Sequence, residues 1–398
     1  MRICIAGTFS YPDGYGAASR IQSYAEGFAA NGTSVIVIPF ERQTGQVQSD
    51  FHEDFSGEAN VTVSFALSGL KHAIEGKKFV GEKIVLYREI VKFNKLVSRL
   101  HNEEPITALI LLGRSLFILL PIIYKCRKLG IKIIHEKSEY PFVYDRKSYL
   151  RNIYYELYNS TMYRLFDGIL VITSMLESYF SGKVGDARKV LKVPILVSDS
   201  LRNRKKMPVG GNNHVILYVG NLEHEEEILM LISSFKTIAE KYLDWTLGIV
   251  GETKIISRKR LYESLIEEGN LTTRVKLYGK LPRTRIPKML ANSDILVLPR
   301  SAGVFSTAGF PTKLGEYLMA GKPVVVTATG DIPSYLRNEV DSYLVEPGNE
   351  LMFSNAILRI IENYPDAAKV GQEGRITALR EFGCSRHCAR IINFIKQL

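Results

Sequence analysis

Short apolar runs rich in β-branched residues recur along the chain and alternate with longer segments whose apolar residues follow helical spacing. In the first half, the runs expected to be strands are residues 2–6, 34–38, 61–65, 107–112, 131–135 and 168–172. In the second half, they are residues 215–219, 246–250, 275–278, 295–298, 324–327 and 342–345. Strands that alternate with helices form parallel sheets. The pattern therefore predicts an α/β protein with a Rossmann-like parallel sheet in each half.

The length of 398 residues favours two domains, each large enough to bury a core. Residues 202–213 are polar and contain glycines, as expected of a linker. We therefore expect a first domain at residues 1–204 and a second at residues 205–380. Three further helices are expected at residues 351–363, 367–382 and 385–397.

The stretch from residue 309 to 326, GFPTKLGEYLMAGKPVVV, is expected to form a loop, a short helix and a buried strand. Pro311 is tolerated in a first helical turn, because its missing N–H would have no intrahelical partner there. Gly321 can adopt the left-handed conformation that ends a helix, and Pro323 prevents the helix from continuing. Another apolar strand precedes the stretch, so the helix begins where open α/β sheets bind ligands.

Two charged residues on this short helix indicate the kind of ligand. Lys313 and Glu316 are three positions apart and therefore share a helix face. Free N–H groups at a helix start, together with a cation, suit a phosphate. A carboxylate one turn further on can accept hydrogen bonds from the vicinal hydroxyls of a ribose. The pair therefore predicts a nucleotide, with an ordinary solvated ion pair as the alternative.

The first strand–loop–helix–strand unit is Rossmann-like, but its glycines argue against a dinucleotide dehydrogenase. Gly7, Gly14 and Gly16 do not have the spacing of the G-x-G-x-x-G motif. Glu41, just past the second strand, is the one residue that keeps this class open.

The run from Gly309 to Val325 resembles the donor-nucleotide motif of retaining, GT-B-fold glycosyltransferases of the group 1, or family 4, type. The match covers most of the chain in order and spacing. It implies two Rossmann-like domains that face a central cleft, and a terminal helix at residues 381–398 that packs on the first domain. The implied reaction moves a sugar from a nucleotide-diphosphate donor to a hydroxyl.

The resemblance also assigns roles to individual residues. Gly14 and Gly16 match a first loop that approaches donor phosphate or acceptor, although a flexible turn explains them equally well. His135 matches a histidine that follows the fifth strand and contacts the donor sugar, and Glu139 is a second candidate in the same loop. The remaining donor-binding candidates are Gly220, Asn221, Gly251, Gly309, Phe310, Pro311, Thr312 and Leu314.

The chain departs from the family pattern at three positions. The family's Arg and Lys that hold the donor diphosphate fall on Asn221 and Glu226, and Glu226 has the wrong charge for that role. The first glutamate of the E-x7-E pattern falls on Ala308, which leaves only Glu316. These departures indicate either lost activity or a subfamily with its cations elsewhere.

Arg300 and Lys313 are the candidate replacements for the missing cations. A guanidinium matches phosphate oxygens bidentately, and an ammonium offers a point charge. Both would stabilise the negative charge that develops on the departing diphosphate, while His135 would orient the sugar and Glu316 would hold the ribose. No Asp-x-Asp motif is present, so no metal or other cofactor is expected beyond a UDP- or GDP-linked sugar.

Charge is concentrated in the first half. The net charge is +11, and residues 71–151 contain 17 Lys and Arg against 8 Asp and Glu. Residues 83–99 place cations on an expected helix with apolar residues between them, a pattern typical either of anionic membrane surfaces or of a solvated face. Residues 106–124 are apolar but interrupted, so a strand and a helix are expected rather than a membrane span. Nucleic-acid binding would rest on charge alone and is not expected.

The N-terminus lacks the pattern of a signal peptide, and four cysteines are too few for a disulfide framework. We therefore expect a cytoplasmic protein, peripheral at the inner face of the membrane. Cys384, His387 and Cys388 are interpreted as helix packing rather than as a metal site.

Three functions stay open at this point. The first is a glycosyltransferase of surface polysaccharide or glycolipid synthesis, with a glycan or lipid-linked acceptor. The second is a nucleotide-sugar epimerase, whose acid/base pair would have to come from His135, Glu136 and Glu139. The third is a non-catalytic partner that keeps the fold, which Ala308 and Glu226 would favour.

Overall fold

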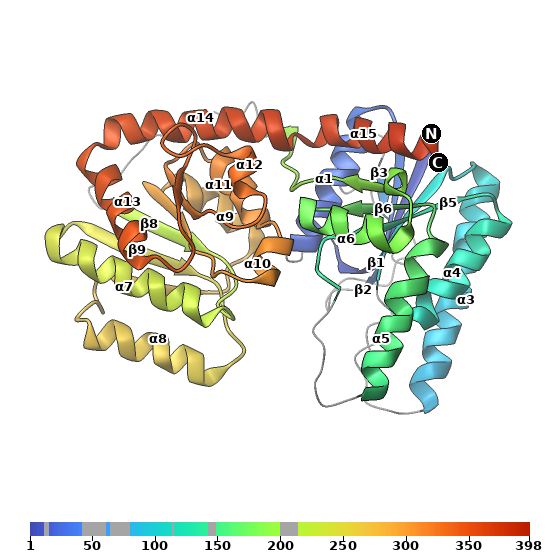
Figure 1. Ribbon diagram of the computed structural model, residues 1–398, viewed down its shortest axis with the longest axis horizontal. Helices are drawn as coiled ribbons and strands as arrows, with labels where there is room; N and C mark the ends of the chain where they lie inside the picture. The colour runs from blue at the N-terminus through green and yellow to red at the C-terminus, as the bar shows by residue number, and fades with distance from the viewer. Residues whose placement is uncertain (12–15, 42–60, 64–79, 114, 142–148, 200–213) are drawn as a thin grey trace. The chain divides into compact units, whose positions relative to one another are not determined.

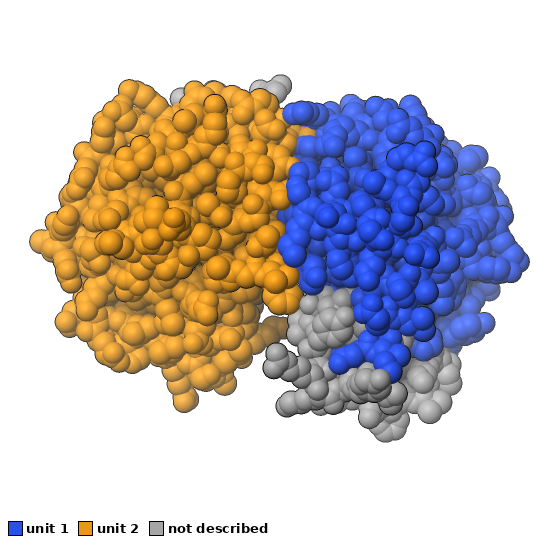
Figure 2. Space-filling view, viewed as in Figure 1, with its two compact units in different colours: residues 1–199, 384–398 blue, residues 200–383 orange. Residues whose placement is uncertain are grey.

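The computed structural model describes residues 1–11, 16–41, 61–63, 80–113, 115–141, 149–199 and 214–398. The chain divides into two compact units (Figure 2). Unit 1 comprises Met1–Asp199 and Cys384–Leu398, and unit 2 comprises Ser200–Gly383. The sequence had placed these divisions after residues 204 and 380.

Unit 1 is built on a seven-stranded sheet with the order β3-β2-β1-β4-β5-β6-β7, and all its strand pairs are parallel. Its strands are β1 (Arg2–Ser10), β2 (Ser34–Glu41), β3 (Val61–Val63), β4 (Ala108–Leu112), β5 (Lys132–Lys137), β6 (Gly168–Val171) and β7 (Val190–Lys192). Its helices are α1 (Gly16–Ala30), α3 (Val80–Glu103), α4 (Leu116–Lys128), α5 (Tyr149–Thr161), α6 (Ser174–Val184) and α15 (Cys384–Gln397), with short 3-10 turns η1 (Met162–Leu165) and η2 (Ala187–Lys189).

The terminal helix α15 packs on α1 within unit 1 (Figure 1). Ile391 and Ile395 are fully buried in the same apolar cluster as the central strands of the sheet. Gly27 of α1 permits this contact, because an added Cβ would lie 2.6 Å from the Cys384 carbonyl oxygen and from Cys388 Sγ. A side chain at this position would force the two helices apart.

Unit 2 contains a six-stranded parallel sheet with the order β10-β9-β8-β11-β12-β13. Its strands are β8 (His214–Val219), β9 (Trp245–Val250), β10 (Val275–Gly279), β11 (Ile295–Leu298), β12 (Val324–Thr327) and β13 (Tyr343–Val345). Its helices are α7 (Glu225–Lys241), α8 (Ile256–Glu268), α9 (Ile286–Ala291), α10 (Val304–Ala308), α11 (Thr312–Met319), α12 (Ile332–Tyr335), α13 (Glu350–Glu362) and α14 (Tyr364–Phe382), with a 3-10 turn η4 (Arg283–Arg285). Each unit is thus a Rossmann-like α/β layer structure, as the alternation of strands and helices predicted.

The boundaries of three elements bear on the site. α11 begins at Thr312, with Pro311 at its N-cap rather than in its first turn. Gly321 has a φ of 67° just past the helix, which confirms its predicted left-handed conformation. β5 runs two residues past His135, to Lys137, and stays paired with β6 there. The expected end of this strand was wrong, because buried polar residues continue the strand after its apolar run.

Candidate functional site

The strand order of unit 2 reverses between β8 and β11, which are neighbours in the sheet. The chain leaves β8 toward α7, and it leaves β11 toward α10 and α11. Loops on the two sides of such a reversal diverge, and open α/β sheets bind ligands at this place. The loops after β8 and β11, together with α11, therefore form the candidate site.

The loop after β8 is held close to the loop after β9. The Gly220 N–H donates to the Val250 carbonyl oxygen at 3.0 Å. Gly251 has a φ of 150°, and an added Cβ would lie 2.0 Å from the Gly220 carbonyl oxygen. Asn221 is exposed, and its Oδ1 accepts a hydrogen bond from the Glu223 N–H at 3.1 Å. These residues shape the loop, and Gly251 is required for the close approach of the two backbones.

Arg258 of α8 ties this loop down, a role that the sequence analysis missed. Its Nη1 donates to Glu223 Oε2 at 3.0 Å, and its Nε donates to Glu225 Oε2 at 3.1 Å. These partners are more than thirty residues apart in the chain, so no local spacing signals the contact.

Arg300 follows β11, and its guanidinium has few partners. Its backbone N–H donates to Thr327 Oγ1 at 2.9 Å, which fixes the residue at the carboxyl edge of the sheet. Nη2 reaches only the Ser306 carbonyl oxygen, at 3.4 Å, and Nε has no hydrogen-bond partner among the described residues. Burial lowers the pKa of Arg300, against the attraction of Glu227 and Tyr218. A half-buried guanidinium with unused donors is suited to binding an anion.

Glu227 is the buried acidic neighbour of Arg300, and the sequence analysis did not single it out. It lies in the first turn of α7, and its Oε1 accepts a hydrogen bond from the Ser301 N–H at 3.3 Å. Burial raises the pKa of this carboxyl, although His224, the Ser301 N–H and Arg300 act in the opposite direction. A sequence signal existed, because Glu227 lies four residues before the buried Leu231 and so falls on the apolar face of the helix.

α11 is attached to the end of β8 by a buried tyrosine. The Tyr317 hydroxyl accepts a hydrogen bond from the Val219 N–H at 2.6 Å and donates to the Val219 carbonyl oxygen at 3.2 Å. Tyr317 is fully buried. The helix that carries Lys313 and Glu316 is thereby fixed at the point where the strand order reverses.

Lys313 and Glu316 contact each other, with 2.8 Å between Nζ and Oε2. Their side chains are 32% and 28% exposed. This ion pair was the alternative to a nucleotide contact, and a phosphate at the helix start would have to share Lys313 with Glu316. Gly309 brings the loop close to Arg300, because an added Cβ would lie 3.6 Å from Arg300 Nη2.

Two of the donor-binding candidates point into the core. Phe310 is buried, and its ring packs edge-on against Tyr335 and Phe382, at centroid distances of 5.6 and 5.7 Å. Leu314 is fully buried. Their side chains therefore do not face a ligand, and the two residues stay predicted donor-binding positions through their backbone alone. Only their backbone is available to a ligand, whereas Pro311 and Thr312 are half-buried.

The positions that depart from the family pattern differ in burial. Ala308 is fully buried at the end of α10. Glu226 is exposed in the first turn of α7. The substitution at 308 therefore lies inside the packed unit, whereas the reversed charge at 226 faces the surface.

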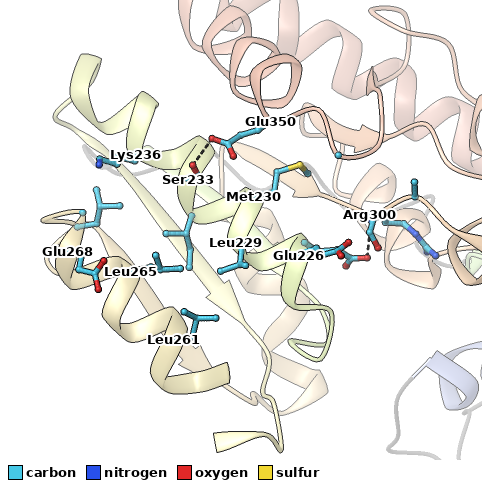
Figure 3. A pocket seen from close by; sticks show the side chains of 17 residues that line it. Glu226, Leu229, Met230, Ser233, Lys236, Leu261, Leu265, Glu268, Arg300 and Glu350 are labelled. Carbon is cyan, nitrogen blue, oxygen red and sulfur yellow. Dashed lines mark hydrogen bonds between the residues drawn. The ribbon is translucent and has the colours of Figure 1, made fainter. Parts of the chain in front are cut away.

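A cavity of about 950 Å³ extends along α7 from Arg300 toward α8 (Figure 3). Its charged lining comprises Glu226, Glu227, Lys236, Glu268, Arg300 and Glu350. Four carboxylates against two cations disfavour a diphosphate over most of this cavity. Arg300 supplies a cation at the end next to the loop that contains Gly309, and Glu226 and Glu227 line the same end.

In unit 1, His135 lies inside β5 and is fully buried, not in a loop as expected. Its Nε2 lies 3.1 Å from the Gly113 carbonyl oxygen, and its ring stacks on Phe166 at 4.2 Å. Burial and the nearby Lys137 lower the pKa of His135 well below its ordinary value. The imidazole is neutral, and Nε2 must carry the proton because a carbonyl can only accept. The ring is packed in the core, its Nδ1 has no hydrogen-bond partner among the described residues, and its contact with a donor sugar stays a prediction.

Glu136, an acid/base candidate of the epimerase hypothesis, is also occupied. Its carboxylate accepts hydrogen bonds from Arg20 Nε and from the Tyr24 hydroxyl, both at 2.8 Å, and from the Ser138 hydroxyl. Arg20 is buried as well and donates to the Val193 and Pro194 carbonyl oxygens. This network is structural, and it argues against a proton-transfer role for Glu136.

The remaining donor-binding candidates of unit 1 are Gly14, Gly16 and Glu139. Gly14 lies outside the described residues, and Gly16 is the first residue of α1. Glu139 is exposed in the bend after β5. The structure thus collects Arg300, Gly309, Lys313 and Glu316 in unit 2, but it does not assemble a comparable group around His135.

The two cysteines and the histidine of α15 pack within unit 1. Cys388 Sγ lies 3.6 Å from the Tyr24 carbonyl oxygen, and His387 Nδ1 lies 3.1 Å from Arg390 Nη1. Across the described ranges, no group of three or more His, Cys, Asp or Glu side chains is placed to hold a metal ion. In the same ranges, no helix combines the length and hydropathy needed to cross a bilayer.

The sequence profile of the family described as Glycosyl transferases group 1 matches residues 199–377. This range is nearly the whole of unit 2. Unit 2 is a group 1 glycosyltransferase domain.

Curated relatives match part of the chain at low identity. The amylovoran biosynthesis glycosyltransferase AmsK of Erwinia amylovora is 25% identical over 168 residues, 42% of this chain and 40% of that protein. An Escherichia coli UDP-Gal:alpha-D-GlcNAc-diphosphoundecaprenol alpha-1,3-galactosyltransferase is 29% identical over 155 residues, 38% of each chain. The match thus spans about two fifths of these relatives' length.

Solved structures match the whole chain. Sucrose-phosphate synthase from Thermosynechococcus elongatus gives a TM-score of 0.72 at 17% identity and covers 100% of this chain and 98% of its own. Anabaena Alr3699/HepE in complex with UDP gives 0.69 at 16% identity and covers 100% of both chains. These likenesses show the GT-B fold that the group 1 glycosyltransferase domain implies.

Proposed function

We propose that the protein transfers a sugar from a nucleoside-diphosphate donor to a hydroxyl acceptor in the synthesis of surface polysaccharide or glycolipid. The observation that carries the proposal is Arg300. Its guanidinium is half-buried at the switch point of unit 2, its Nε has no partner among the described residues, and Gly309 passes beside it. A diphosphate would use those donors and would add the charge-assisted hydrogen bonds that the apo site lacks.

The residues of unit 2 have distinct roles in this reaction. As the anomeric bond breaks, negative charge builds on the leaving diphosphate, and Arg300 stabilises it together with Lys313 and the start of α11. Glu316 holds the ribose hydroxyls, and Lys313, which contacts Glu316, is shared between this carboxylate and the phosphate. Retention of anomeric configuration is implied by the family resemblance alone, and no described residue of unit 2 is a candidate covalent nucleophile.

Uracil is the proposed base, in a UDP-linked donor. The Anabaena structure contains UDP, and the Escherichia coli relative is named for UDP-galactose and a diphosphoundecaprenol acceptor. A lipid-linked acceptor would place the protein at the inner face of the membrane, which is the localisation we propose. AmsK is named for amylovoran biosynthesis, and its name supports a role in polysaccharide assembly.

Thermal melts with UDP, GDP and ADP test the donor site. A nucleoside diphosphate at a hundredfold excess over its Kd should stabilise the protein by about 2.7 kcal/mol. Arg300→Gln and Lys313→Ala should abolish the shift, and Arg260→Gln, an exposed cation of α8, should leave it unchanged. A shift with UDP alone names the base. No shift with any of the three would refute the donor site.

A non-catalytic partner is the second candidate, because Glu226 has the wrong charge and Ala308 replaces the family's first glutamate. An assay of UDP release distinguishes a transferase from a non-catalytic partner. The donor is UDP-glucose or UDP-galactose, and the acceptor is a sugar or a polyprenyl phosphate. Nucleotide binding without release from any donor would favour the non-catalytic protein.

A further inference from the structure

The outward face of α3 carries a continuous row of cations. Arg88, Lys92, Lys95 and Arg99 are all exposed, and their spacing of four, three and four residues places them on one side of the helix. The opposite side is buried and apolar, with Phe93 among its residues. Lys92 and Arg99 contact glutamates of their own helix, and Arg88 and Lys95 form no ion pair with the part of the chain that the structure describes.

The outward face of α4 carries a row of exposed apolar side chains instead. Phe117, Leu120 and Tyr124 are 72%, 45% and 62% exposed, at a spacing of three and four residues. Three more cations, Lys125, Arg127 and Lys128, occupy the last turn of α4. The Lys128 ammonium lies 4.6 Å from the centre of the Tyr124 ring. This face is apolar at its start and cationic at its end.

The two rows belong to one surface of unit 1. α3 and α4 pack against each other, and Asn94 Nδ2 donates to the Pro121 carbonyl oxygen at 3.5 Å (Figure 1). Each helix buries its inner face, so the cations of α3 and the apolar residues of α4 lie on the exposed sides of two neighbouring helices. We call this the α3–α4 surface.

We infer that the α3–α4 surface docks on an anionic lipid bilayer. Lys and Arg close to such a membrane are attracted by its negative surface potential. Aromatic and aliphatic side chains on the same face insert at the boundary between headgroups and acyl chains, where Tyr is favoured. Lysine is depleted at protein–protein interfaces, which disfavours a protein partner for this surface. The inference extends the membrane-facing part of the proposed function, but it rests on residues of unit 1 alone.

Co-sedimentation of the full chain with vesicles of phosphatidylcholine, with and without phosphatidylglycerol, tests the inference. The protein should bind the anionic vesicles and should dissociate from them as salt is raised. The variant Arg88→Gln/Lys92→Gln/Lys95→Gln/Arg99→Gln should bind about tenfold more weakly or worse, because each of the four lost cations contributes separately. The variant Lys241→Gln/Lys254→Gln/Lys259→Gln/Arg260→Gln removes the same charge from exposed positions of unit 2 and should bind normally.

A second pair of variants tests the apolar row. Phe117→Ser/Tyr124→Ser should lose the binding that persists at high salt, whereas Leu243→Ser, at an 84% exposed position of unit 2, should not. These residues are exposed, so all variants should melt at the wild-type temperature, and their UDP-induced shift should be unchanged. Membrane binding and donor binding can therefore fail separately.

Equal vesicle binding by wild type and the α3 variant would overturn the inference, as would a folded wild type that ignores anionic vesicles. Sedimentation velocity without lipid tests the alternative, in which a second copy of this chain binds the α3–α4 surface. A dimer that Phe117→Ser/Tyr124→Ser dissociates, without vesicle binding by the wild type, would assign the surface to self-association instead.

Discussion

The Tyr317 hydroxyl makes two hydrogen bonds to Val219, one from the N–H at 2.6 Å and one to the carbonyl oxygen at 3.2 Å. Val219 is the last residue of β8, so a single side chain joins α11 to the central strand of unit 2. The position of Lys313 and Glu316 relative to the sheet depends on this attachment.

Tyr317→Phe should therefore lower both the stability and the nucleotide response. The change leaves the buried Val219 N–H without its partner, which costs about 1–3 kcal/mol. Urea unfolding should show this loss, and the UDP-induced thermal shift should shrink because α11 is no longer fixed.

Tyr364→Phe is the matched control. The Tyr364 hydroxyl donates to the Asp294 carbonyl oxygen at 3.2 Å, just before β11 and so at the opposite edge of the sheet. This variant should lose a similar amount of stability and keep the UDP shift. An undiminished UDP shift in Tyr317→Phe would show that the attachment does not position the site.

Periodicity predicted the sheets and the donor element well. Apolar runs of four to six residues that alternate with helices predict parallel sheets, which both units contain. Pro311, Gly321 and Pro323 bracket α11 through backbone chemistry, which is local and therefore readable.

The polar interior of the chain was not readable in the same way. His135 and Glu136 follow an apolar run and so were interpreted as loop residues, yet they remain in β5 because Gly113, Arg20 and Tyr24 provide buried partners. Hydrogen-bond partners that come from distant segments of the chain cannot be predicted from the spacing of nearby residues.

Phe310 and Leu314 illustrate a second limit. A motif identifies which positions matter, but not which way each side chain points. In the stretch around Gly309, residues whose side chains pack in the core alternate with residues whose side chains face the surface of the unit. Glu227 shows the opposite limit. Its helical spacing places it on the apolar face of α7, but it was not singled out because it belongs to the charged run Glu225–Glu227.

The buried pair Arg20–Glu136 predicts a large asymmetry between single and double substitutions. Arg20→Met should destabilise the protein by about 3–5 kcal/mol, because it leaves the Glu136 carboxylate buried without its main partner. Arg20→Met/Glu136→Leu should recover most of this loss in urea unfolding. A double variant as unstable as the single one would mean that the pair itself, rather than its unmatched charge, holds unit 1 together.

His135 predicts a loss of stability in acid. Its pKa is depressed in the folded protein, so the unfolded chain binds the proton first. The stabilisation is full above the ordinary histidine pKa of 6.5 and falls as pH drops below it, by up to about 1.4 kcal/mol per pH unit.

His135→Gln should remove this part of the pH dependence when urea unfolding is measured between about pH 7.5 and about pH 5, the range in which histidine changes its charge. The prediction concerns how stability changes with pH, whatever stability the substitution costs at neutral pH. Parallel stability curves for His135→Gln and wild type would contradict the buried neutral imidazole.

Glu227 links stability to donor binding. Burial raises the pKa of its carboxyl in the folded protein, so the folded state prefers the protonated form. This contribution to stability is present below the ordinary carboxyl pKa and is lost as pH rises through the raised value.

Glu227→Gln should therefore gain stability relative to wild type as pH increases, and it should enlarge the UDP shift, because a negative charge beside Arg300 is removed. Glu226→Gln makes the same charge change at an exposed neighbour and should gain less on both counts. If Glu227→Gln instead lost the UDP shift, the carboxylate would be needed to hold Arg300 in place, and its role would be positioning rather than repulsion.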